Sequence, residues 1–344
     1  MALTEEDIKK LREAFTTCTR PVVLFDDDAD GLTSFLMLYN HVKDGKGIPV
    51  KSSPKLGADF ARMVNDYSPD LVVILDMPMV DQEFLDKIPA RKIWLDHHPI
   101  LERKNVEYYN PRRENPEDNR PTSYWMYKIM QKPLWIAMCG IVADWSLPEK
   151  EMREEFEKEY PGLLPLEVTR PEVAIHDTPL AKLIMALAFN LKGRTQEVIK
   201  SVKVLTRIKD PYEILKQESP AGRFIYKKFK KLDEEYQQLL KEVKASKNDK
   251  MIIFKYKSAN AVSYSTELSN AIIYKHPDKF VIVAWEYNGE YKCSLRTTMQ
   301  DLTKIIPIAL KGVRGYGGGH AHAGGSCVHI DDFDQYVENI RREL

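Results

Sequence analysis

Short apolar runs alternate with helix-like stretches along the first 145 residues, and this alternation restricts the fold more than any other feature of the chain. Runs such as LVVIL are too short for helices and are apolar at every position, which is typical of strands buried on both faces. The stretches between them, for example LTSFLMLYNHV, have helical spacing. The rhythm predicts an α/β fold in which helices cover both faces of an open parallel sheet. The expected strands cover residues 21–25, 48–52, 71–75, 92–95 and 106–109.

The pattern changes twice further along the chain. Residues 151–250 show helical spacing without a convincing strand, and 221–247 is expected as one long helix. Three more strands follow, and the last two join across Asn288-Gly289, which is a strong hairpin signal; they are expected at 251–256, 279–287 and 290–297. We therefore predict three parts: an N-terminal domain over 1–150, a helical connector over 151–250, and a smaller C-terminal α/β domain over 251–344.

Acidic and imidazole side chains follow three of the expected N-terminal strands. They are Asp26, Asp28 and Asp30 after the first strand, Asp76 after the third, and Asp96, His97 and His98 after the fourth. In an open α/β sheet, ligands bind beyond the carboxyl ends of the strands. These side chains are therefore expected at one edge of the sheet, where their like charges need compensation.

Each group has a plainer interpretation when it is taken alone. An Asp-rich turn after a strand is often an Asx-turn or a helix cap, and Asp76 could simply cap the next helix. Taken together, converging carboxylates and imidazoles are the ligands that divalent ions require. The absence of cysteine from these motifs favours Mn²⁺ or Mg²⁺ over zinc.

Asp144 fits the same set. It ends the largely apolar, helix-like run IAMCGIVA, where a carboxylate is out of place on a plain core face. The alternative is a helix end that emerges into solvent. We include Asp144 among the expected metal ligands.

A glycine-rich cluster, GYGGGHAHAGGS, occupies residues 315–326. Glycines let backbone amides approach a phosphate closely, and imidazoles add donors or cations. Arg296, at the end of an expected strand, is a candidate for bidentate contact with a phosphate. The alternatives are a flexible surface loop and, for His-Ala-His, a metal site. The expected substrate-binding residues are Gly317, Gly318, Gly319, His320, His322 and Arg296.

Composition limits the functional classes. The 51 basic and 51 acidic residues give a net charge of zero, which argues against a protein that coats nucleic acid. No apolar run is long enough to cross a bilayer, and four scattered cysteines favour free thiols in a reducing cytoplasm. The basic run 223–231 is interpreted mainly as a solvated helix face.

The ordered motifs DDDADG, ILD, DHH, ADW and GGGH resemble those of the DHH phosphoesterase superfamily. SLRT followed by GGGHAHAGG resembles its companion DHHA1 domain. The resemblance spans the chain, with the middle helices the least diagnostic part. The alternating acids of the first motif look RecJ-like, and the overall build is similar to archaeal single-strand nucleases, a group that includes the Hef-associated nuclease.

The resemblance implies two divalent ions, preferably Mn²⁺ with Mg²⁺ possible. Asp26 and Asp28 would hold one ion, Asp30, His97 and Asp144 the other, and Asp76 would bridge them. His98 would face the substrate phosphate as a donor or general acid, so His98, Asp76 and Asp28 are the expected catalytic residues. The C-terminal residues would hold a neighbouring phosphate across a cleft between domains. One departure concerns a metal-binding His of the first motif, whose positions here hold Leu24 and Asp26.

The resulting expectation is a cytoplasmic two-metal phosphodiesterase, foremost an exonuclease that degrades single-stranded DNA or RNA to mononucleotides in repair or replication. A repair helicase or replisome protein is implied as a partner by the resemblance alone. One alternative is a phosphatase for short oligoribonucleotides, 3′-phosphoadenosine phosphate or cyclic dinucleotides. A non-catalytic replication or repair scaffold ranks last, because only the first-motif His differs.

Overall fold

The computed structural model describes residues 3–51, 55–246 and 248–344. The chain divides into two units, Met1–Phe229 and Lys230–Leu344. The boundary falls inside α12 (Pro220–Glu242), the long helix expected at 221–247. Ile225 and Phe229 of this helix are buried, so its basic run lies on an amphipathic helix, as the plainer interpretation expects. The predicted division at residues 150 and 250 stays a prediction.

The N-terminal unit is built on a five-stranded sheet with the order β2-β1-β4-β6-β7, in which every neighbouring pair is parallel. This confirms the parallel sheet that the alternation predicts. Its central strand, β4, is buried at all five positions, as expected for a strand covered on both faces. The strands are β1 (Val22–Asp26), β2 (Lys46–Val50), β4 (Leu71–Leu75), β6 (Arg91–Leu95) and β7 (Glu107–Tyr109). A separate two-stranded parallel sheet joins β3 (Lys55–Leu56) and β5 (Met79–Val80).

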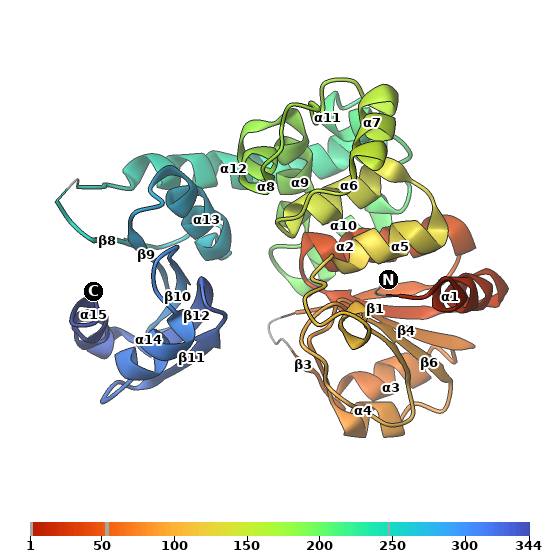
Figure 1. Cartoon of the computed structure of the whole chain (residues 1–344), viewed down its shortest axis with the longest axis horizontal. Helices are drawn as coiled ribbons and strands as arrows, with labels where there is room; N and C mark the ends of the chain where they lie inside the picture. The colour runs from red at the N-terminus through yellow and green to blue at the C-terminus, as the bar shows by residue number, and fades with distance from the viewer. Residues whose placement is uncertain (1–2, 52–54, 247) are drawn as a thin grey trace. The chain divides into compact units, whose positions relative to one another are not determined.

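Helices cover both faces of the five-stranded sheet, with α3 and α4 on one face and α1, α2 and α5 on the other (Figure 1). Residues of α3 and α4 share a hydrophobic cluster with the strands, which buries the apolar stripe of each helix. Further helices follow α6 as far as α12. The helices of this unit before α12 are α1 (Glu5–Thr17), α2 (Ala29–Val42), α3 (Phe60–Asn65), α4 (Gln82–Asp86), α5 (Thr122–Met130), α6 (Leu134–Ala143), α7 (Lys150–Glu159), α8 (Pro171–Asp177), α9 (Pro179–Asn190), α10 (Thr195–Leu205) and α11 (Pro211–Leu215), with a 3₁₀ turn at Pro111–Arg113.

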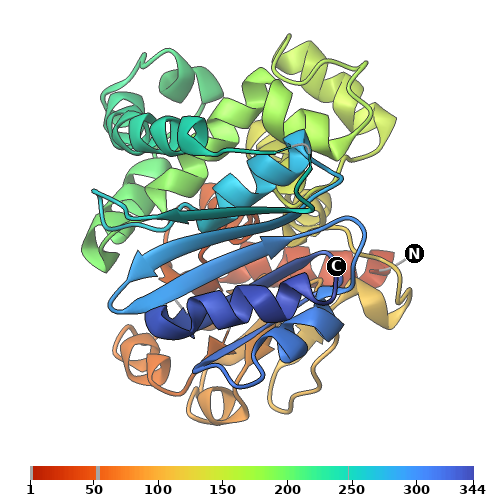
Figure 2. The same ribbon diagram turned by 90° about the vertical axis from the view of Figure 1, so that its left-hand side faces the viewer.

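The C-terminal unit has a mixed sheet with the order β11-β12-β10-β9-β8, in which only β8 pairs in parallel (Figure 2). Leu302, Ile306 and Tyr336 pack α14 and α15 into one hydrophobic cluster with the strands. Ser269 of α13 meets Ser294 of β10 on the opposite face, with their hydroxyls 2.9 Å apart. The elements are β8 (Met251–Tyr256), α13 (Ser265–Lys275), β9 (Phe280–Tyr287), β10 (Glu290–Arg296), α14 (Leu302–Ala309), β11 (Gly315–Gly319), β12 (Ala323–His329), a 3₁₀ turn (Ile330–Asp332) and α15 (Phe333–Arg341).

Two turns of this unit test the sequence interpretation in opposite ways. The hairpin between β9 and β10 is confirmed, with positive φ at Asn288 and Gly289 as a two-residue turn requires. The glycine-rich cluster, by contrast, is mostly a second hairpin, formed by β11 and β12. The interpretation of this cluster as a loop was wrong. Glycine has little intrinsic preference for strands, so the sequence carries no strand signal here, and the pairing of β11 with β12 decides the structure.

Candidate metal centre

The register of the parallel sheet brings the predicted acids to one edge. Phe25 pairs with Leu75, and Leu75 pairs with Leu95, so β4 and β6 end at the same level and β1 ends one residue further, at Asp26. The next residues along the chain are Asp26, Asp76 and Asp96. Three overlapping groups of potential ligand atoms result, with all atoms of a group within 4.8 Å of one another. The groups are Asp26, Asp28 and Asp76; Asp30, His97 and Asp144; and Asp76, His97 and His98.

The first motif forms a tight turn from β1 into α2. Asp28 caps α2 by accepting a 2.9 Å hydrogen bond from the amide of Gly31, so the helix-cap interpretation is correct for this residue without excluding metal contact. A Cβ on Gly31 would lie 2.6 Å from the carbonyl oxygen of Asp26. Glycine at position 31 therefore allows the first turn of α2 to pack on the backbone of the acid cluster.

Asp76 lies at the centre of the cluster. It is 1% exposed, and its φ of 60° places it in the left-handed region, which is sparsely populated by non-glycine residues. The hydroxyl of Thr122 donates a 3.1 Å hydrogen bond to its carboxylate. Burial and the surrounding carboxylates, first that of Asp30, raise the pKa of Asp76 well above its ordinary value. A backbone strained at such a position indicates a functional constraint.

His97 is oriented by a backbone carbonyl. Its Nδ1 lies 3.2 Å from the carbonyl oxygen of Asn119 and must donate to it, which leaves Nε2 as the free lone pair. Nε2 lies 3.4 Å from Asp76 and 3.7 Å from Asp144. Burial lowers the pKa of His97, which favours the neutral imidazole. This is the arrangement by which proteins fix a metal-binding histidine.

His98 has a different partner, the buried carboxylate of Asp96. Its Nδ1 lies 2.7 Å from Asp96 Oδ1, and Asp96 also accepts from the hydroxyl of Tyr108 at 3.3 Å. Although burial alone would lower it, the hydrogen bond and charge of Asp96 raise the pKa of His98. A protonated His98 would present Nε2–H as a donor. Asp96, for which the sequence pattern predicts no separate role, is therefore the residue that orients His98.

Asp30 and Asp144 are held by the helices on one face of the sheet. The amides of Thr122 and Ser123, at the start of α5, donate to Asp30 at 2.8 and 2.7 Å. Asp144 directly follows α6 as its C-terminal cap, and its side chain is one-third exposed. A Cβ on Gly140 would lie 2.1 Å from the Thr33 hydroxyl, so glycine allows α6 to pack closely on α2.

Asp27 faces a different environment from its neighbours in the first motif. Its carboxylate lies 3.9 Å from the ammonium of Lys51, which also donates to the carbonyl of Gly193 at 3.0 Å. Burial raises the pKa of Asp27 to about 6, although Lys51 counteracts the shift. Lys51 was not anticipated, because nothing in its local sequence distinguishes it from a surface lysine.

The donor set suits divalent ions. In the part of the chain that the structure describes, His97 forms ion pairs with Asp76 and Asp144, and His98 forms one with Asp76. No lysine or arginine there forms an ion pair with any of the six predicted ligands. Burial and Asp28 raise the pKa of Asp26 to about 7, as expected for crowded carboxylates without a counter-charge. Oxygen ligands with one or two imidazoles match Mn²⁺ and Mg²⁺.

The predicted phosphate-binding residues of the C-terminal unit are only partly brought together. Arg296 and Gly319 line a hollow of about 410 Å³, together with Ser263, Ser265, Thr266 and Lys292. Arg296 is anchored there by a 2.7 Å hydrogen bond to Asn270, and burial lowers its pKa to about 10, so it stays cationic at neutral pH. The other predicted residues do not line this hollow: Gly317, Gly318, His320 and His322.

The glycines of the hairpin have a structural explanation of their own. A Cβ on Gly319 would lie 2.5 Å from the carbonyl oxygen of Ala323, and its φ of 156° is rare for other residues. The amide of His320 donates to the same carbonyl at 2.8 Å, while its side chain is exposed, as is that of His322. The dense glycine run is therefore needed in part for close strand pairing.

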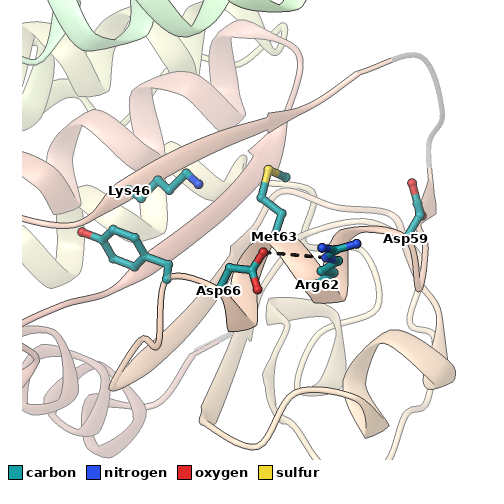
Figure 3. Close-up of a pocket in the computed structure, with 6 residues that line it drawn as sticks. Lys46, Asp59, Arg62, Met63 and Asp66 are labelled. Atoms are coloured by element: carbon teal, nitrogen blue, oxygen red, sulfur yellow. Dashed lines mark ion pairs between the residues drawn. The ribbon is translucent and has the colours of Figure 1, made fainter.

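A separate hollow of about 360 Å³ lies elsewhere on the N-terminal unit and contains none of the predicted site residues (Figure 3). It is lined by Lys46, Asp59, Arg62, Met63, Asp66 and Tyr67. Lys46 begins β2, whereas the carboxylate cluster follows the ends of the strands. Its mixed charges include the Arg62–Asp66 ion pair at 3.9 Å, and we assign it no role in the chemistry.

Residues 21–166 match the family model described as "DHH family, N-terminal domain". This match supports the DHH superfamily that the motifs resemble. No curated protein sequence matches the chain. No helix in the described residues is long and apolar enough to span a membrane.

Solved structures share the fold over both units. RecJ from Thermus thermophilus, in complex with Mn²⁺, aligns with a TM-score of 0.71 and 15% identity over 100% of this chain and 55% of that one. Exonuclease RecJ bound to manganese aligns with a TM-score of 0.66 and 15% identity over 99% and 94%. A pGpG-specific phosphodiesterase from Vibrio aligns with 0.51 and 15% over 94% and 98%. The chain spans just over half the length of the Thermus RecJ.

Proposed function

We propose that this protein is a two-metal phosphodiesterase of the RecJ-like archaeal type. It acts as an exonuclease that degrades single-stranded DNA or RNA to mononucleotides in DNA repair or replication. The observation that carries the proposal is the gathering of five aspartates and two histidines into three overlapping ligand groups at one sheet edge. Because all six ligands predicted for this chain are present in these groups and only the first-motif histidine of the family is missing, a non-catalytic scaffold is the weaker interpretation.

The groups suggest how the ligands divide. Asp26 and Asp28 would hold one divalent ion, and Asp30, His97 and Asp144 the other. Asp76 belongs to a group with Asp26 and Asp28 and to another with His97, and it would bridge the two ions. Asp26 would take over the ligand role of the histidine that the first motif lacks.

The bound ions, preferably Mn²⁺, would polarise the phosphate and lower the pKa of water at the site. The protein would supply the remaining functions. His97, fixed by Asn119, offers Nε2 as a ligand, and Thr122 and Ser123 hold Asp30 in place. His98, whose pKa Asp96 raises, would donate a proton or hydrogen bond to the substrate phosphate.

A second phosphate of the substrate would bind in the Arg296 hollow of the C-terminal unit. The hollow combines a guanidinium with the hydroxyls of Ser263, Ser265 and Thr266 and with Gly319. Arginine and hydroxyl donors suit phosphate oxygens. Contact by His320 and His322 stays a prediction, and so does the helicase or replisome partner.

A second candidate is a phosphodiesterase for very short nucleotides. It is supported by the fold shared with the pGpG-specific phosphodiesterase, of which this chain covers 98%. The zero net charge of the chain is compatible with small substrates. Both candidates use the same metal centre and differ in the length of the substrate.

The test is incubation of 5′- and 3′-end-labelled single strands of DNA and RNA, and of the dinucleotide pGpG, with Mn²⁺ and then with EDTA. We expect Mn²⁺-dependent release of mononucleotides from one end of the long strands. Cleavage of pGpG alone would favour the second candidate. Full turnover in EDTA, with negligible residual metal, would contradict the metal centre itself.

A further inference from the structure

Two adjoining hollows lie at the far end of α2 from the metal centre, both within the N-terminal unit. The first, of about 330 Å³, is lined by Tyr39 and Thr206 and by four cations: Lys43, Lys203, Arg207 and Lys209. The second, of about 260 Å³, shares Lys43 and Lys209 and adds Lys132 and His41. In the described ranges, no carboxylate lines either hollow. We call this surface the α2–α10 basic patch.

The two shared lysines converge on one neutral group. The ammonium of Lys43 lies 3.3 Å from Asn40 Oδ1, and that of Lys209 lies 3.5 Å from the same oxygen. One amide oxygen does not neutralise two like charges. Burial and the charge of Lys209 lower the pKa of Lys43, in keeping with this crowding.

The backbone holds both lysines in place. Lys43 ends α2 in the left-handed conformation, with its amide bonded to the carbonyl of Tyr39 at 2.8 Å. The indole of Trp135 donates to the carbonyl of Lys209 at 3.1 Å. Two acids close in sequence to these lysines are bound to backbone amides: Glu213 accepts from the amides of Lys209 and Asp210, and Asp44 accepts from the amide of Gly45. The convergence of cations is therefore a built feature of the fold.

We propose that the α2–α10 basic patch binds backbone phosphates of the nucleic-acid strand whose end is cleaved at the metal centre. The proposal deepens the function proposed above and rests on it for the identity of the substrate. Lysine and arginine without carboxylates suit phosphates, and the half-buried Tyr39 lines the same hollow, where its ring would contact a base. An acidic protein segment would use the cations but not the ring.

The position of the patch sets the class of substrate. α2 has 14 residues, so its two ends lie about 20 Å apart at ~1.5 Å per residue. Because residues 29–38 of α2 are buried, a strand must follow the surface and the straight distance is a lower bound. At ~3.4 Å per phosphate of a stacked strand, it corresponds to roughly six nucleotides or more. A dinucleotide at the metal centre cannot reach the patch, whereas an oligonucleotide can. The patch thus selects for polymers over dinucleotides.

The test compares binding of fluorescent dT₂₀ and U₂₀ in EDTA, where no cleavage occurs, to the wild type and a Lys43→Gln/Lys209→Gln variant. Each lost phosphate contact on a single strand should reduce the salt slope of log K by about 0.7, so two contacts give about 1.4. At 0.1 M salt this corresponds to roughly 25-fold weaker binding. Lys9→Gln/Lys10→Gln is the matched control, because it removes two exposed charges from α1. The control variant should change neither the salt slope nor the affinity at 0.1 M salt.

Turnover separates this proposal from the proposed function. With Mn²⁺, the patch variant should lose kcat/KM on dT₂₀ and keep its rate on pGpG. If the wild type cleaves neither substrate, the proposed function fails, while the binding experiment still decides whether the patch contacts nucleic acid. Equal oligonucleotide affinity in the variant and the wild type would overturn the proposal, as would loss of binding to polyglutamate but not to dT₂₀.

Discussion

The candidate metal centre of the N-terminal unit and the glycine hairpin of the C-terminal unit arrange polar and charged groups in opposite ways. The metal centre gathers side-chain charges, several of them buried, which helices and backbone groups hold at the ends of parallel strands. The hairpin has exposed histidines and closely paired glycines, and the hollow beside it depends on one anchored arginine and a lysine for its charge. The comparison teaches that a cluster of negative side chains needs strand ends and hydrogen-bond partners to hold it. The proposed phosphate contact needs only access to the backbone and an anchored cation.

The largest effect is expected at the metal centre. Asp76→Ala should lower kcat with Mn²⁺ by about 1,000-fold or more, because metal ions contribute several kcal/mol to the transition state. Asp28→Ala and His97→Ala should behave alike. Asp27→Ala is the matched control, since Asp27 pairs with Lys51 rather than with the cluster, and it should lose less than about tenfold. Near-normal rates for Asp76→Ala would refute its bridging role.

The C-terminal unit should show a smaller effect of a different kind. Arg296→Ala should lower kcat/KM by roughly 10- to 100-fold, the scale of a hydrogen bond to a charged group. Mn²⁺ binding, measured by calorimetry, should not change. His320→Ala should have the weaker effect, because His320 does not line the hollow. A loss for His320→Ala equal to that for Arg296→Ala would restore the histidine contact predicted from sequence.

The metal-free N-terminal unit should gain stability as pH falls from about 7 to 4. The pKa of Asp26 is raised to about 7 in the fold but is ordinary, near 3.9, in the unfolded chain. In that window the folded state therefore binds the additional proton. In EDTA, the rise in Tm between pH 7.5 and 5.5 should be smaller for Asp26→Asn than for the wild type. Equal rises of Tm in the two proteins would show that Asp26 does not cause this pH dependence of stability.

The smallest effect on stability is expected at Arg314, which directly precedes β11. Here stability should fall, rather than rise, as the pH is lowered. Arg314 donates to Asp332 through Nε at 2.7 Å and Nη2 at 2.8 Å, which lowers the pKa of that carboxyl. A depressed pKa contributes stability above pH ~4 that is lost as pH falls further. Asp332→Asn should thus lower Tm slightly at pH 6, and the difference from the wild type should shrink at pH 3. A difference that grows with acid would contradict the ion pair.

Sequence reasoning worked where the signal is local. Asp26 and Asp76 could be placed at one edge because they lie at the ends of apolar strands, and parallel strands end together. The orienting roles of Asp96 and Asn119 depend on the folded positions of their partners, so no local pattern distinguishes them. The strand at 315–319 could not be predicted, because its strand character comes from pairing with β12 and not from its glycines.

The backbone of Asp76 has a consequence for how this protein can change over time. A left-handed conformation at a non-glycine residue costs about 1–3 kcal/mol, and the crowded carboxylates add to that burden in the metal-free chain. Substitution of Asp76 by glycine would relieve much of this backbone cost and would also remove the carboxylate. If Asp76 holds the ions as we propose, a substitution that stabilises the metal-free chain at this position would also remove the proposed activity.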